Sequence, residues 1–172
     1  RSGHTNMCVN REIYGKRRGA FSEYAVLPER VVCPLSDRLS LEEGAVLENL
    51  GIAVHAVEAE GHDPGDWAVI IGAGPIGILA SQALVAWGVN TAITELSAPR
   101  LEAARRLSGA VVIDAGREDP VQCVMDLTKG KGADFVIEMG ATQKALDQAF
   151  EMVRIRGTIV TIGTFDEPVS FN

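Results

Sequence analysis

Cysteine, positive charge and long apolar runs are all scarce in this sequence. The cysteines are Cys8, Cys33 and Cys123, which are scattered and odd in number. This pattern argues against a disulfide framework and favours a reducing compartment. We therefore expect a cytoplasmic protein in which Cys33 and Cys123 are small buried side chains.

The shortage of positive charge and of apolar runs excludes two classes of partner. The net charge is −7, whereas a protein that grips nucleic acid needs a basic face. No apolar run reaches the roughly 20 residues that cross a bilayer, since glycines and a proline interrupt the most apolar stretch, Ala68–Leu79. We expect no signal peptide, and because the chain starts with Arg1 rather than Met, we expect its natural beginning to lie upstream.

What the sequence does contain is the composition of a folded protein, with a change of pattern near Gly61. Apolar residues make up 47% and charged residues 23% of the 172 positions. Before Gly61, turn residues and short apolar stretches predict strands within Ala20–Leu27 and Arg30–Pro34. Ser40 and Glu43 have the spacing of a capping box, which predicts a helix that begins near Leu41.

After a turn at His62–Asp66, strand and helix patterns alternate. The order predicts a parallel sheet with helices on both faces, which is a doubly wound α/β domain. The expected strands are Ala68–Ile71, Thr91–Thr94, Ala110–Ile113, Phe135–Glu138 and Thr158–Ile162, and the expected helices are Ile76–Trp87, Ala98–Leu107, Pro120–Thr128 and Gln143–Val153.

A glycine-rich loop, Gly72-Ala73-Gly74-Pro75-Ile76-Gly77, lies between the first of these strands and its helix. It matches the G-x-G-x-x-G pattern of Rossmann domains. In that pattern Gly72 allows the tight turn, Gly74 lets a pyrophosphate approach the backbone, and Gly77 lets helix and strand pack closely. The start of the helix then offers free N–H groups to the phosphates. The segment predicts a dinucleotide-binding site.

An acidic residue, Glu95, ends the second expected strand, 18 positions after Gly77. A carboxylate at this place accepts hydrogen bonds from the adenosine ribose and repels a 2′-phosphate. We therefore expect NAD as the cofactor and NADP less. Arg100 weakens this preference, because a nearby arginine can pair with a 2′-phosphate.

Two further glycines, Gly140 and Gly163, follow the fourth and fifth expected strands. Ligands of open α/β sheets bind outside the carboxyl ends of the strands. Both glycines are therefore candidates for the cofactor crevice, and the alternative is that they are turn glycines.

With these motifs, the whole chain resembles the middle of a zinc-type medium-chain dehydrogenase, in the branch of sorbitol and threonine dehydrogenases. The segments that carry the resemblance are Gly19–Ala25, Gly44–Val57, Gly72–Gly77, Ser97–Leu101, Glu118–Val121, the run Gly132–Ala141 and Arg156–Gly163. This chain departs from the family pattern at two places. Asn49 stands where proline is usual, and Arg156 stands where the first glycine of a Gly-Gly pair is common.

The resemblance implies an enzyme with a GroES-like, β-rich catalytic domain split around a Rossmann domain. Residues 1–58 would then be the C-terminal part of the catalytic domain with a connecting helix. Residues 59–172 would be the NAD-binding domain, which lacks the sixth strand of the family. The expected activity is zinc-dependent oxidation of a secondary alcohol or polyol by hydride transfer to nicotinamide. The parent would be a homo-oligomer, a dimer or a tetramer.

The resemblance also implies roles for two residues toward zinc. Cys8 would be the fourth ligand of the family's structural zinc lobe, whose third cysteine would precede Arg1. Glu48 would lie at or near the catalytic zinc, as a ligand or through the bound water. The alternatives are a lone reduced cysteine and an ordinary carboxylate on a helix. Zinc would lower the pKa of the bound alcohol.

The expected cofactor site is completed by residues near each bound group. The pyrophosphate would be held by Gly72, Gly74, Pro75, Ile76 and Gly77. The adenosine end would be held by Glu95 and Arg100. The nicotinamide side would be held by Gly140, Ile162, Gly163 and Thr164. Two other hypotheses stay open. The chain as it stands is a dinucleotide-binding module without catalysis, or it comes from a zinc-independent reductase of the same superfamily.

Overall fold

The computed structural model describes residues 22–58 and 61–171. The chain divides into two compact units, Arg1–Gly44 and Ala45–Asn172. In the described part of the first unit the backbone forms the 3-10 turn η2 (Glu29–Val31) and no strand. The strands predicted before residue 35 are therefore wrong for the described residues. A strand needs a partner for its N–H and C=O groups, and Tyr24 and Val26 are 88% and 101% exposed instead.

Helix α1 (Leu41–Glu58) begins at the predicted residue. The backbone N–H of Glu43 donates to Ser40 Oγ over 3.1 Å, and the N–H of Ser40 donates to Glu43 Oε2 over 2.8 Å. Both bonds of the capping box are therefore formed, which satisfies two N–H groups at the helix start.

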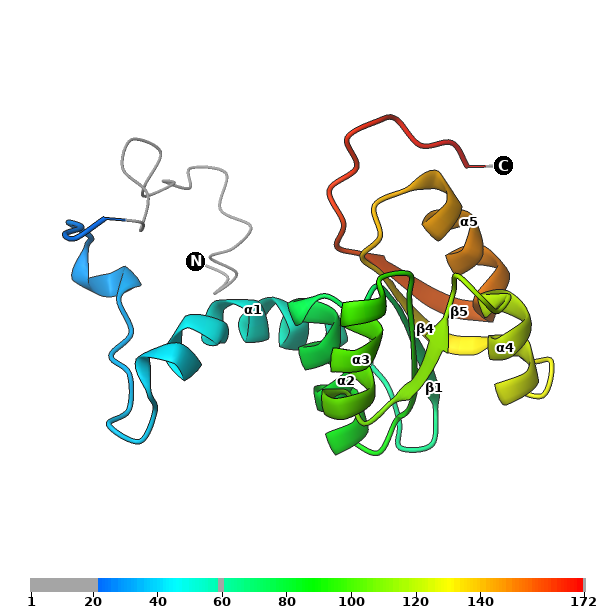
Figure 1. Cartoon of the computed structure of the whole chain (residues 1–172), viewed down its shortest axis with the longest axis horizontal. Coiled ribbons are helices and arrows are strands. Elements are labelled where there is room, and N and C mark those ends of the chain that lie inside the picture. Colours follow the sequence, from blue (N-terminus) through cyan, green and yellow to red (C-terminus); the bar gives the residue numbers. More distant parts are fainter. Residues whose placement is uncertain (1–21, 59–60, 172) are drawn as a thin grey trace. The chain divides into compact units, whose positions relative to one another are not determined.

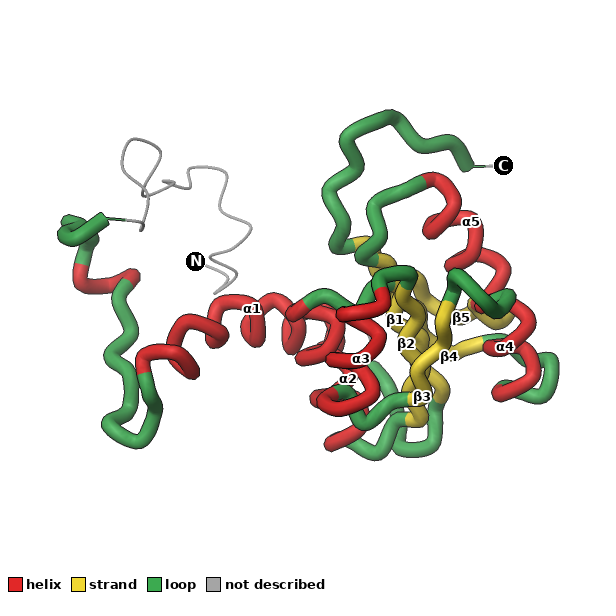
Figure 2. The backbone as a smooth tube through the Cα atoms, viewed as in Figure 1, coloured by secondary structure: helices red, strands yellow, loops and turns green. Residues whose placement is uncertain are grey.

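A five-stranded parallel sheet forms the centre of the unit Ala45–Asn172 (Figure 2), in the order β3-β2-β1-β4-β5. The strands are β1 (Trp67–Ile71), β2 (Asn90–Glu95), β3 (Val111–Asp114), β4 (Ala133–Glu138) and β5 (Val153–Thr161). The first strand, β1, lies in the middle of the sheet. β2 and β3 lie in turn on one side of it, and β4 and β5 lie on the other side. This reversal is the point where ligands of doubly wound sheets bind.

Helices cover both faces of this sheet (Figure 1). They are α2 (Pro75–Ala86), α3 (Ala98–Leu107), α4 (Pro120–Leu127) and α5 (Gln143–Met152). Side chains of α1, α2 and α3 pack on one face, and side chains of α4 and α5 pack on the other. The doubly wound α/β architecture predicted from the sequence is confirmed.

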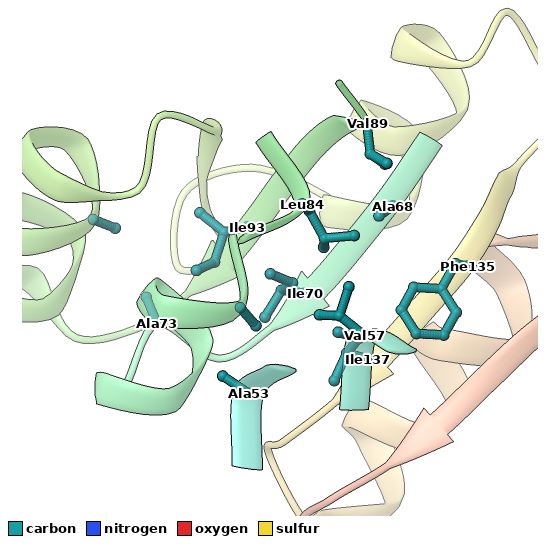
Figure 3. Close-up of a cluster of buried hydrophobic side chains, with 12 residues drawn as sticks. Ala53, Val57, Ala68, Ile70, Ala73, Leu84, Val89, Ile93, Phe135 and Ile137 are labelled. Atoms are coloured by element: carbon teal, nitrogen blue, oxygen red, sulfur yellow. The ribbon is translucent and has the colours of Figure 1, made fainter. Parts of the chain in front are cut away.

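The core side chains are small and branched, as buried parallel strands require. Figure 3 shows one face, where Ile70 of β1, Ile137 of β4 and Leu84 of α2 belong to one cluster of buried side chains. Ala53 and Val57 of α1 join the same cluster and are 0% exposed. The C-terminal half of α1 is therefore part of the sheet-covering layer of its unit.

Strand β5 departs from the prediction at its start. It runs from Val153, whereas the sequence predicted a strand from Thr158. Between the pairs Ala133–Val153 and Phe135–Thr158 the register shifts, and Arg156 has φ 62°. The structure thus places Arg156 and Gly157, which the sequence left outside the strand, in a bulge within it.

The two cysteines among the described residues are less buried than the sequence predicted. Cys33 is exposed and Cys123 is half-buried, so the expectation that both are buried is wrong. Within residues 22–58 and 61–171, no helix has the length and apolarity that a membrane crossing requires.

Candidate functional site

A cleft of about 420 Å³ lies at the carboxyl ends of the strands, beside the reversal between β1 and β4. Its walls come from the loops that follow β1, β2, β3 and β4 and from the first turns of α2 and α5. The lining residues are Ile71, Gly72, Gly74, Pro75, Ile76, Gly77, Thr94, Glu95, Leu96, Arg100, Ala115, Met139, Gly140, Thr142, Lys144, Ala145 and Gln148.

The glycine loop has a backbone that only glycine supports at two positions. Gly72 has φ +113°, a value that side chains rarely allow. A Cβ at Gly77 would lie 2.1 Å from the carbonyl oxygen of Gly72, so helix α2 is packed directly against the loop. A Cβ at Gly74 would meet nothing within 4 Å. The cleft is therefore open above Gly74, where a ligand can approach the backbone.

The first turn of α2 is free to bind an anion. Gly74 is its N-cap and no side chain caps it, Pro75 follows, and the turn carries no acidic residue. By contrast, the starts of α4 and α5 are capped by Asp119 and Thr142. An uncapped helix start presents N–H groups and the positive end of the helix dipole to the cleft.

Glu95 binds backbone on both sides of the cleft floor. Its Oε2 accepts from the N–H of Ala73 over 2.9 Å. Its Oε1 accepts from Leu96 and Ser97 over 2.7 and 2.9 Å. The side chain is 8% exposed and also forms an ion pair with Arg100, with 3.8 Å between Oε2 and Nη1. The carboxylate therefore connects the end of β2 to the glycine loop.

Burial raises the pKa of Glu95, but its partners outweigh this effect. The amides of Ser97, Ala73 and Leu96 and the charge of Arg100 together hold the pKa below its ordinary value. Glu95 is therefore a carboxylate anion at neutral pH. A carboxylate has about four acceptor positions, so three amides leave one for a ligand hydroxyl.

The predicted residues fall into two groups in the structure. Eight of them line the cleft: Gly72, Gly74, Pro75, Ile76, Gly77, Glu95, Arg100 and Gly140. Ile162, Gly163 and Thr164 do not line it. The N–H groups of Ile162 and Gly163 instead donate to the carbonyl of Glu138 over 2.9 and 3.4 Å, and Thr164 is exposed.

Several lining residues were absent from the sequence-based site. Lys144 and Gln148 are four positions apart on α5 and face the cleft. Thr94 and Leu96 flank Glu95, and Met139 precedes Gly140. The rule that named Gly140 would have found Met139, because both follow β4, but nothing local in α5 indicates which of its faces lines a cleft.

The residues with predicted zinc roles do not form a metal site by themselves. Glu48 is exposed on α1, and Cys8 lies outside the described residues. Among residues 22–58 and 61–171, no three His, Cys, Asp or Glu side chains come together as potential ligands. These residues therefore do not fit a zinc ion, and both zinc roles stay predictions.

Comparisons with known proteins agree with this geometry. The family model for zinc-binding dehydrogenases matches residues 75–172. The (R,R)-butanediol dehydrogenase of Neisseria gonorrhoeae is 35% identical over 155 residues, which cover 90% of this chain and 44% of that protein. The L-threonine 3-dehydrogenase of Pyrococcus abyssi is 35% identical over 174 residues, which cover 100% and 50%. The alcohol dehydrogenase of Aeropyrum pernix has a similar structure, with a TM-score of 0.84 and 30% identity over 97% of this chain and 50% of that one.

The chain belongs to the zinc-binding medium-chain dehydrogenase family. The unit Ala45–Asn172 has the fold of the family's coenzyme-binding domain. The resemblance drawn from the sequence is thus confirmed. The chain spans about half the length of the curated relatives it matches.

Proposed function

We propose that this chain is the dinucleotide-binding part of a dehydrogenase that oxidises a secondary alcohol or a polyol with NAD. One observation carries the proposal. The glycine loop and Glu95, the last residue of β2, line the same cleft and are joined by the hydrogen bond from the N–H of Ala73 to Glu95. A cleft lined by a glycine loop and a carboxylate is what a dinucleotide requires.

The glycine loop would hold the pyrophosphate. Gly74 leaves the space above the backbone open, and the uncapped start of α2 offers N–H groups next to it. Pro75, Ile76 and Gly77 make the first turn of this helix and have no carboxylate among them. Two negative charges would therefore meet only amides and the positive end of the dipole.

Glu95 supports NAD over NADP. As an anion with one acceptor position left, it can accept a hydrogen bond from a ribose hydroxyl, and it would repel a 2′-phosphate at the same place. Arg100 lies close enough to attract such a phosphate but is already paired with Glu95. We therefore propose a preference for NAD rather than an absolute exclusion of NADP.

The nicotinamide would lie toward the end of β4, where Gly140 lines the cleft. Bound NAD supplies an acceptor for the hydride that leaves the alcohol carbon. Ile162, Gly163 and Thr164 follow β5 beside this wall, and we propose that they border the nicotinamide side.

The alcohol chemistry belongs to the whole protein. On this proposal residues 1–58 are the C-terminal part of the catalytic domain with a connecting helix, and residues 59–172 form the cofactor domain. The parent is a homo-oligomer, and Cys8 and Glu48 serve zinc together with residues outside this chain. Within residues 22–58 and 61–171, no cluster of side chains could hold that zinc without such outside ligands.

Thermal unfolding of the 172-residue chain with and without NAD tests the proposal. A ligand that binds only the folded state at 100 times its Kd adds about 2.7 kcal/mol, which raises Tm by roughly 8 °C for a chain of this size. NADP at the same concentration should give a smaller rise. An unchanged Tm at millimolar NAD, in a sample shown to be folded, would reject the proposal.

A second candidate function is a dinucleotide-binding module that catalyses nothing by itself. It is favoured by the absence of a metal-ligand cluster within the described ranges 22–58 and 61–171. An assay for alcohol-dependent formation of NADH separates the two candidates. NADH formation by the full-length protein would exclude the module, and NAD binding by the full-length protein without NADH formation would support it.

A further inference from the structure

Glu138 is the last residue of β4 and is completely buried, with 0% exposure. It pairs with Ile71 of β1 on one side and with Thr161 of β5 on the other. Its Oε2 is a buried atom without a hydrogen-bond partner among the described residues. A buried carboxyl group with an unused oxygen is costly, so its presence between apolar strands requires a reason.

The side chain and backbone of Glu138 connect the cleft wall to the strands behind it. Oε1 accepts from the N–H of Ala141 over 2.7 Å. The carbonyl accepts from Ile162 after β5, and the next residue, Met139, donates to the carbonyl of Ile71 over 3.1 Å. The loop that follows β4 is therefore tied to the ends of three adjacent strands.

This loop has a conformation that needs support. Ala141 has φ 51°, a region that side chains disfavour unless the surroundings fix it. A Cβ at Gly140 would lie 2.9 Å from the Cβ of Ala145 and 3.2 Å from Glu138 Oε1. A Cβ at Gly163 would lie 2.7 Å from the Cβ of Ala141. The loop is thus enclosed on two sides, and the bond to Glu138 fixes its one left-handed residue.

The same loop is a wall of the cleft, since Met139, Gly140 and Thr142 line it together with the glycine loop. Glu138 itself does not line the cleft. Its carboxyl group lies directly behind the wall, where it cannot contact a ligand but can hold the residues that do.

We propose that Glu138 is a positioning residue for the dinucleotide cleft, whose bond to the Ala141 amide holds the loop Met139–Thr142 in the shape that receives the cofactor. This inference rests on the proposed function of dinucleotide binding. On this inference Glu138 affects the affinity for the dinucleotide although its side chain does not touch the dinucleotide.

The chemical state of Glu138 indicates which substitution preserves this role. Burial raises the pKa of the carboxyl group, and the amides of Ala141 and Gly140 offset the rise only in part. Glutamine has the shape of the neutral acid and keeps an oxygen for Ala141. Methionine keeps the length of the side chain but offers the amide no acceptor of comparable strength.

The experiment compares Glu138→Gln and Glu138→Met with the unchanged chain, measuring the Kd for NAD by calorimetry and Tm by thermal unfolding. We expect Glu138→Met to raise Kd by about tenfold, the size of one lost hydrogen bond. Glu138→Gln should stay within about twofold of the unchanged chain.

Asp134→Asn is the matched control, because Asp134 lies near the other end of β4. It accepts from the N–H of Trp67 over 2.8 Å and pairs with Arg154, far from the cleft lining. Its substitution should lower Tm and leave Kd unchanged. A merely structural role for Glu138 predicts the same pattern for Glu138→Met, and that result would overturn the inference.

The remaining outcomes are also decisive. If the unchanged chain does not bind NAD, the proposed function fails and this inference with it. If the unchanged chain binds NAD and both Glu138 variants bind it with the same Kd as the unchanged chain, only this inference fails. If Glu138→Met does not fold, hydrogen exchange in the unchanged chain decides. Protection of the Ala141 amide that increases with NAD supports the role, and exchange as fast as in an unstructured chain rejects it.

Discussion

Two buried carboxyl groups end the strands on either side of β1, and they differ in their chemical state. Glu95 ends β2 with a pKa below the ordinary value, whereas Glu138 ends β4 with a pKa above it. Burial raises the pKa of both. Glu95 has three amide donors and Arg100 as partners, whereas the carboxyl group of Glu138 has the amides of Ala141 and Gly140. The partners of each carboxyl group, set against the effect of its burial, thus determine the direction of its pKa shift.

The two states suit the two places. The charged group borders the cleft, where it can discriminate between a ribose hydroxyl and a phosphate. The group with the raised pKa lies behind the wall formed by Met139–Thr142, where the amides of Ala141 and Gly140 offset the effect of burial only in part. Each of the following changes alters one side of this comparison.

Glu95→Ala should have the largest effect. It leaves the amides of Ala73, Leu96 and Ser97 without their acceptor, at a cost of about 3 kcal/mol in folding free energy. It should also weaken NAD by roughly 100-fold, through the lost ribose contact and the loosened glycine loop. Calorimetric titration with NAD and with NADP measures the loss of affinity for each cofactor.

The control for this change is Glu102→Ala, which removes an exposed glutamate from α3 and should change neither affinity. The loss for NAD should exceed the loss for NADP. Equal losses would mean that Glu95 supports the loop but does not touch the ribose.

Glu138→Gln should stabilise the protein, and increasingly so as pH rises. Because the folded state raises the pKa of Glu138, it binds this proton more tightly than the unfolded chain does. The stability that depends on the proton is complete below the unfolded pKa and is lost as pH rises through the folded one. Glutamine does not titrate, so the variant should gain stability over the unchanged chain as pH rises and should gain none below the unfolded pKa.

Denaturant unfolding at several pH values measures this difference. Glu95→Gln is the opposite case. The lowered pKa of Glu95 stabilises the folded state at pH values above the unfolded pKa, and this contribution is lost as pH falls through the folded pKa. The gap between Glu95→Gln and the unchanged chain should therefore close in acid. Parallel pH profiles for the two variants would contradict the comparison.

Arg100→Ala should have the smallest effect. Its ion pair with Glu95 is 3.8 Å long and the arginine side chain is 62% exposed, so its loss should cost no more than about 0.5 kcal/mol of stability. NAD affinity should stay within about twofold, while NADP should bind more weakly because a cation near the 2′ position is gone. A large loss of NAD affinity would show that Arg100, rather than the amides, keeps Glu95 charged.

The parts of the molecule that could be predicted from sequence are those with local causes. The capping box of α1 and the glycine loop depend on residues a few positions apart, and their structures agree with the prediction. The sheet followed from the alternation of apolar strands and helices. The strands expected before residue 35 were wrong because a strand depends on a partner, which no local pattern guarantees.

The parts that could not be predicted depend on contacts distant in the sequence. Glu138 looks like the polar end of an apolar strand, and only the contacts with Ile71 and Ile162 show that it stands behind a cleft wall. Lys144 and Gln148 face the cleft because of how α5 packs. Glu95 was predicted as a ribose contact, but its bond to Ala73 became visible only when β1 and β2 were placed side by side.

The bond between Glu95 and Ala73 has a consequence for binding kinetics. It fixes the glycine loop before any ligand arrives, so little conformational entropy remains to be lost when the cofactor docks. Encounter then requires no rearrangement of the loop, and the association rate should be nearly the same for variants that leave this bond intact. Differences in affinity among them should arise in the dissociation rate, that is, in how long the dinucleotide stays.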